Sequence, residues 1–152
     1  MTTEQLRHRM PPILKALKER SLRGRTPVEG LRRTECAYHG WDTVHADAAS
    51  WEPFAPGANP MHGRDVNGTV PLPEASAGKR VVCLVSTGAS DIWNNNNPQF
   101  LAYVDGRLVC GLDVNHNEFD LAACAVPGES HELALYVYCN TPARDVFLRV
   151  ET

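Results

Sequence analysis

Apolar and polar residues alternate with a period of two along much of the chain from residue 80 onward, as in half-buried β-strands. In segment 131–139 one face collects Leu133, Leu135, Val137 and Cys139, and the other collects Ala134, Tyr136 and Tyr138. Near the end, a second such segment points Val146, Leu148 and Val150 inward. The run Val81–Val85 is almost continuously apolar, which predicts a strand buried on both faces. Turn residues separate these segments, so the pattern predicts a mainly β chain folded as an antiparallel sandwich.

The strongest local signal lies at residues 100–110. An apolar run, Phe100 to Val104, meets Asp105-Gly106 and returns as residues 108–110. Asp-Gly suits a two-residue hairpin turn because that turn needs positive φ at both central positions. We therefore expect a β-hairpin here.

The N-terminal segment predicts a short helical lead-in. A helix is expected to begin at Pro11-Pro12, where proline is tolerated, and to run through Arg20. Its apolar residues, Ile13, Leu14 and Leu17, share one face. A loop rich in glycine and proline follows, so we divide the chain into a basic, helical lead-in (1–35) and a β-sandwich domain (36–152).

Charge is distributed unevenly between these two parts. Residues 1–33 hold nine Arg and Lys against three Glu, which leaves six basic and fifteen acidic side chains for residues 34–152. No aromatic residue interrupts the basic segment, so a base-stacking nucleic-acid site is not expected there. No apolar run long enough for a signal peptide or a membrane span is present. The five cysteines lack a CxxC pair and three of them sit in apolar runs, which favours reduced thiols in the cytoplasm.

A polar cluster follows the hairpin. Asp113, Asn115, His116 and Glu118 lie within six residues, directly after an apolar strand. An EF-hand would need glycine at its sixth position and glutamate at its twelfth, and Glu118 and Cys124 stand there instead. An irregular calcium site stays open as an alternative. Our main interpretation is a hydrogen-bonded corner that braces the hairpin and faces an adjoining domain.

Several of these segments resemble one enzyme family. Residues 97–101, the Tyr103-Val104-Asp105-Gly106 turn, the run from Gly111 to Glu118, and the segments 51–54 and 70–74 resemble the N-terminal β-sandwich domain of bacterial α-mannosidases of glycoside hydrolase family 38. Just before Val70-Pro71 the family usually has tryptophan and phenylalanine, and this chain has residues 60–68 without either. The resemblance implies a galactose-binding-like jelly roll.

The resemblance also implies a function. It identifies a non-catalytic scaffold module of a zinc-dependent α-mannosidase, without the catalytic barrel, so no cofactor is expected in this chain. The partners implied are the catalytic domain or a partner subunit, and a homo-oligomer stays open. One alternative is a free-standing carbohydrate-binding module for mannose-type glycans, with Trp93 as the best aromatic platform, followed by Trp51 and Trp41. A truncated enzyme with residual activity is the third interpretation of the chain.

One segment resembles a catalytic zinc motif. Family 38 catalytic domains carry His-x-Asp-x-Ala-Trp, and residues 45–51 place the tryptophan one position late. A catalytic zinc needs further ligands on neighbouring elements, and the strands leave no length for a barrel. We therefore expect His45 and Asp47 to be surface loop residues.

Overall fold

The structure is a computed structural model that describes residues 3–21, 24–35, 48–55, 64–72, 74–87, 98–138 and 149–152. Its helical elements are α1 (Thr3–Ser21) and two short 3-10 helices, η1 (Ala48–Ser50) and η2 (Glu74–Ser76). Its strands are β1 (Arg32–Glu35), β2 (Glu52–Pro53), β3 (Arg64–Pro71), β4 (Val81–Ser86), β5 (Gln99–Val104), β6 (Arg107–Leu112), β7 (Glu118–Ala122), β8 (Ser130–Tyr138) and β9 (Arg149–Glu151).

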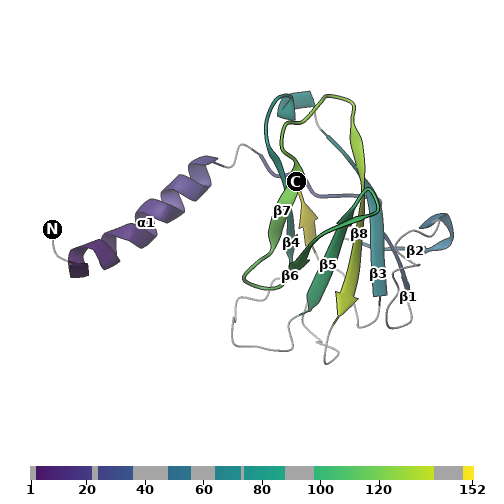
Figure 1. The fold of residues 1–152 in the computed structure, drawn as a ribbon, viewed down its shortest axis with the longest axis horizontal. Coiled ribbons are helices and arrows are strands. Elements are labelled where there is room, and N and C mark those ends of the chain that lie inside the picture. The colour runs from purple at the N-terminus through teal and green to yellow at the C-terminus, as the bar shows by residue number, and fades with distance from the viewer. Residues whose placement is uncertain are drawn as a thin grey trace.

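The strands form two antiparallel sheets, which confirms the predicted β-sandwich (Figure 1). The larger sheet has six strands in the order β2-β1-β3-β8-β5-β6, and the smaller has three in the order β7-β4-β9. In the larger sheet β8 is central, with Leu135 in register with Val66 of β3 on one side and Ala102 of β5 on the other. The two strands that flank β8 therefore come from distant parts of the sequence.

The β5–β6 hairpin is confirmed. Asp105 and Gly106 adopt φ angles of 49° and 73°, as the two-residue turn requires. The register shifts at Val109, which is the extra residue between the pairs Ala102–Cys110 and Tyr103–Leu108. Such a bulge bends the strand, and here it lies on β6, one of the two edge strands in the order given for the larger sheet.

The hydrophobic core lies between the two sheets. The alternation predicted for β8 is confirmed, because Leu133, Leu135 and Val137 are fully buried there. The smaller sheet contributes Val81, Cys83 and Val85 of β4 to the same core. Residues 139–148 and the side chain of Val150 fall outside the described residues, so the predicted inward positions of Cys139, Val146, Leu148 and Val150 stay predictions.

The expectation that β4 is buried on both faces is wrong. Its residues alternate between buried and half-buried, and Val82 and Leu84 point to the half-buried outer face. Strand β4 is central in its sheet, but that sheet has three strands, so only one face meets the core. Val82 and Leu84 therefore stay partly exposed on the outer face.

Residues 24–35 pack with the sandwich. Val28 and Leu31 belong to the core, and β1 pairs with β3 in the larger sheet. Thr26 and Thr152 exchange backbone hydrogen bonds of 2.7 and 2.9 Å, which ties this segment to the end of β9. The division of the chain at residue 35 stays a prediction, but the sandwich includes residues before it.

The helix is longer than predicted. Helix α1 begins at Thr3 and continues through Pro11 and Pro12 to Ser21, so the expected start of the helix at the prolines is wrong. Proline φ fits a helix, and the lost bonds free carbonyls at positions 7 and 8, four residues earlier. These carbonyls can bond water because α1 projects from the sandwich and its described side chains are exposed (Figure 1). Among the described residues, no helix combines the length and hydropathy needed to cross a membrane.

Candidate functional site

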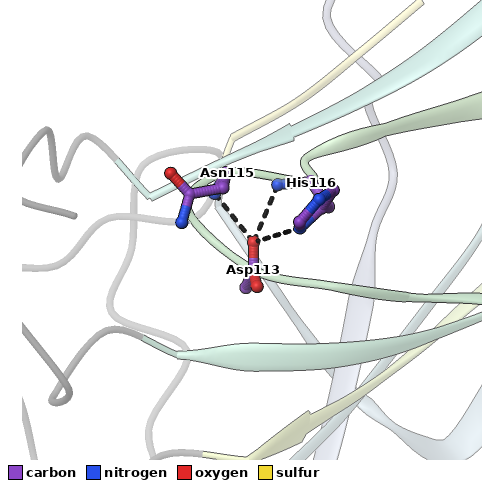
Figure 2. A network of polar contacts seen from close by, with 3 residues as sticks. All are labelled: Asp113, Asn115 and His116. Carbon is purple, nitrogen blue, oxygen red and sulfur yellow. Dashed lines mark hydrogen bonds and ion pairs between the residues drawn. The ribbon is translucent and has the colours of Figure 1, made fainter. Parts of the chain in front are cut away.

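The predicted polar corner lies where the chain passes from β6 to β7. Asp113 Oδ1 accepts hydrogen bonds from the backbone N–H groups of Asn115, at 2.8 Å, and His116, at 2.7 Å. His116 Nδ1 lies 3.1 Å from the same oxygen (Figure 2). The backbone N–H of Asp113 donates to the His116 carbonyl at 2.9 Å and closes the turn. One carboxylate thus organises the whole connection between the two sheets.

The electrostatics of the corner follow from these bonds. The hydrogen bond from the His116 backbone is the main reason why the pKa of Asp113 lies below its ordinary value. The His116 side chain is 80% exposed, and its ring lies at the protein surface. A cation at Oδ1 would have to displace two N–H donors, so the bonding of this oxygen does not suit an irregular calcium site. Within the described ranges, no three His, Cys, Asp or Glu side chains lie close enough to hold a metal ion.

The structure brings together three of the predicted site residues. Asp113, Asn115 and His116 form the corner, whereas Glu118 opens β7 and lies in register with Leu84 of β4. Its side chain is exposed and adds to the negative charge near Arg80. Trp93, the fifth candidate, lies outside the described residues, as do Trp41, His45 and Asp47. A functional role for these residues stays a prediction.

A second polar cluster escaped the sequence analysis. Asp105, at the tip of the β5–β6 hairpin, reaches the start of β8, where its Oδ2 lies 2.8 Å from His131 Nδ1. Its Oδ1 accepts the Glu132 backbone N–H at 2.9 Å, and its own N–H donates to the Glu132 carbonyl at 2.9 Å. The hydrogen bond with His131 is the main reason why the pKa of Asp105 lies below its ordinary value. We call this three-residue contact the turn clamp.

The outer face of the larger sheet carries an apolar cluster. The cluster, called the tyrosine face below, consists of Leu101 and Tyr103 of β5, Leu108 of β6, and Ala134, Tyr136 and Tyr138 of β8. Tyr103 is only 5% exposed although it points away from the core, because Ala134 and Tyr136 pack beside it. Leu101, Leu108 and Tyr138 remain 39%, 54% and 37% exposed. Exposed apolar groups gathered around a buried aromatic ring are typical of an interaction surface.

The aromatic and thiol side chains offer little chemistry in the described part of the chain. Trp51 is buried, so the suggestion that it forms a sugar platform is wrong. Burial raises the pKa of the Cys83 thiol to about 12, which makes it a small hydrophobic group rather than a nucleophile. Burial also raises the pKa of Cys110, and Cys124 is exposed. Cys36 and Cys139 lie outside the described residues.

Comparisons with known proteins define the class of fold. The structure resembles part of a β-glucuronidase from an uncultured Clostridium sp., with a TM-score of 0.53, 12% sequence identity, and coverage of 84% of this chain and 28% of that one. A β-glucuronidase from Faecalibacterium prausnitzii aligns with a TM-score of 0.48 and 18% identity, over 77% of this chain and 22% of that one. No protein-family model matches the sequence, and no curated protein matches it significantly. The chain thus has a β-sandwich fold similar to that of a part of the Clostridium β-glucuronidase, and it spans 28% of the length of that enzyme.

Proposed function

We propose that this chain is a non-catalytic accessory module of a glycoside hydrolase and that it packs against the catalytic domain. The observation that carries this proposal is the tyrosine face. Exposed apolar side chains that lie together on one face of a sandwich are typical of a surface that packs against another domain. The similarity of fold to a part of a β-glucuronidase supports the same class of enzyme.

We further propose that the enzyme is a zinc-dependent α-mannosidase. The support is the resemblance of residues 97–101, 103–106 and 111–118 to the N-terminal sandwich of family 38 enzymes. In such an enzyme the zinc ion belongs to the catalytic domain. This chain supplies a rigid surface for that domain, and the turn clamp fixes the β5–β6 hairpin that carries half of the tyrosine face.

The test uses a zinc α-mannosidase catalytic domain expressed without its own N-terminal sandwich. We expect this chain to co-elute with it in size-exclusion chromatography and to raise its soluble yield. Leu108→Glu places a charge on the tyrosine face and should abolish co-elution. Val126→Glu is the matched control, because Val126 is similarly exposed but lies in the loop before β8. Equal behaviour of the two variants would refute the role of the tyrosine face.

A free-standing carbohydrate-binding module is the second candidate. It is favoured by Tyr138, whose ring is exposed beside the polar side chain of Gln99, its partner in register on β5. Sugars offer apolar C–H faces to such rings and hydroxyls to such amides. A ligand that binds the folded state raises the melting temperature, so methyl α-mannoside at millimolar concentration separates the two candidates. A shift that Tyr138→Ala removes would favour the binding module over the scaffold.

A further inference from the structure

Helix α1 presents an apolar stripe that no described part of its own chain covers. The stripe consists of Leu6, Met10, Ile13, Leu14 and Leu17, which remain 38% to 58% exposed. At about 100° per residue these positions span roughly a third of the helix surface. The same geometry places Arg7 along one border of the stripe, and Arg9 and Arg20 along the other. The helix would therefore pack well on an apolar surface that has carboxylates along its borders.

The outer face of the smaller sheet has this character. Val82 and Leu84 of β4 form its half-buried centre. Register places Asp120 beside Val82, and Glu118 and Glu151 on the two sides of Leu84. Arg80 pairs with Asp120 and Arg25 pairs with Glu151, and Glu118 is exposed beside Leu84.

We propose that two copies of this chain associate by placing α1 of each copy on the outer face of the smaller sheet of the other. The charge distribution favours this occupant, because the basic segment 1–33 then meets the acidic remainder of a second copy. Two α1 helices packed on each other would bring their arginines together, and an anionic membrane would repel the acidic sandwich. This inference does not depend on the proposed function.

The connection to the helix allows such an exchange. Four residues separate Ser21, the end of α1, from Thr26, which is bonded to Thr152 at the edge of the smaller sheet. The helix projects away from its own sandwich (Figure 1). Each copy contributes one helix and one sheet face, so the contact is made twice around a two-fold axis and closes at a dimer.

The test is sedimentation equilibrium of the full chain at low and high salt. We expect a dimer whose dissociation constant rises at least about tenfold between roughly 50 and 500 mM NaCl, because salt screens the charge contacts. At the same salt concentration, the dissociation constant of Ile13→Asp should be higher than that of the wild type. Arg9→Glu and Glu118→Lys should each weaken the dimer about a hundredfold, because each substitution breaks the charge contact twice and one such contact is worth about tenfold. Glu74→Lys, the same charge change on exposed η2, is the control and should leave the dimer unchanged.

Mixing the two weakened variants, Arg9→Glu and Glu118→Lys, gives the sharpest result. In a mixed dimer the helix altered at position 9 faces the sheet altered at position 118, and the unaltered helix of the second chain faces the unaltered sheet of the first. The mixture should therefore regain wild-type affinity. A chain that stays monomeric at low salt, or a dimer insensitive to Ile13→Asp and Glu118→Lys, would overturn the proposal. So would a monomer that floats with phosphatidylserine vesicles. Circular dichroism confirms that each variant is folded.

Discussion

Replacing Asp105 by alanine should destabilise the sandwich measurably. The change removes the acceptor for the Glu132 N–H and the partner of His131 Nδ1. Two hydrogen bonds at a partly exposed site contribute about 1–3 kcal/mol together. Alanine at a φ of 49° adds about 1 kcal/mol, because aspartate tolerates the left-handed region better. We expect a loss of about 3 kcal/mol in the free energy of unfolding, the sum of these two effects.

Urea unfolding followed by circular dichroism measures this loss. Asp105→Asn is the informative second variant, since an amide oxygen can still accept the Glu132 N–H while the charge is lost. It should lose less stability than Asp105→Ala. Asp120→Ala removes an exposed carboxylate that pairs with Arg80 and serves as the control. If Asp105→Ala and Asp120→Ala cost the same, the turn clamp does not brace the hairpin.

The stabilisation by Asp105 should depend on pH. The pKa of Asp105 is lower in the folded protein than in the unfolded chain, with the His131 contact as the main cause. Its contribution is therefore complete above the unfolded value of about 3.9 and is lost as the pH falls through the lower, folded pKa. The difference in stability between wild type and Asp105→Asn should shrink from pH 7 to pH 2. A difference that stays constant over this range would contradict the assigned ionisation.

Three further predictions concern packing, backbone and thiols. Leu135→Ala should cost about 2–5 kcal/mol in urea unfolding because Leu135 is fully buried in the centre of the larger sheet. Gly106→Ala should cost about 1–2 kcal/mol by the same assay, since φ is 73° there, and a neutral result would contradict the turn geometry. In the folded protein Cys124 should react with a thiol reagent within minutes, whereas Cys83, with a pKa raised to about 12, should react only on unfolding.

The sequence predicts the local features of this fold well. Asp105-Gly106 determines a hairpin through backbone geometry alone, and strict alternation in β8 identifies its inner face. The turn clamp could not be predicted in this way, because His131 lies 26 residues from Asp105 and the contact depends on the register between β5 and β8.

Exposure was the harder property to predict. Leu108 and Val109 look like core residues in the sequence, but β6 is an edge strand with a bulge, so both are exposed. The order of the strands in the sheet determines which apolar residues are covered, and this order cannot be read from a single sequence. The polar corner was partly predictable, since Asp113 bonds to the backbone only two and three residues later. Glu118 was grouped with the polar corner because it is close in sequence. In the structure it lies on β7, in register with Leu84 on the outer face of the smaller sheet.

Hydroxyl-radical footprinting tests the proposed function most directly. The chain would be oxidised alone and in the presence of the zinc α-mannosidase catalytic domain, and side-chain oxidation would be quantified by mass spectrometry. We predict that Leu101, Leu108 and Tyr138 become protected while Val126, which is exposed elsewhere, stays reactive. Unchanged oxidation of the tyrosine face, or zinc-dependent hydrolysis of nitrophenyl α-mannoside by this chain alone, would contradict the account.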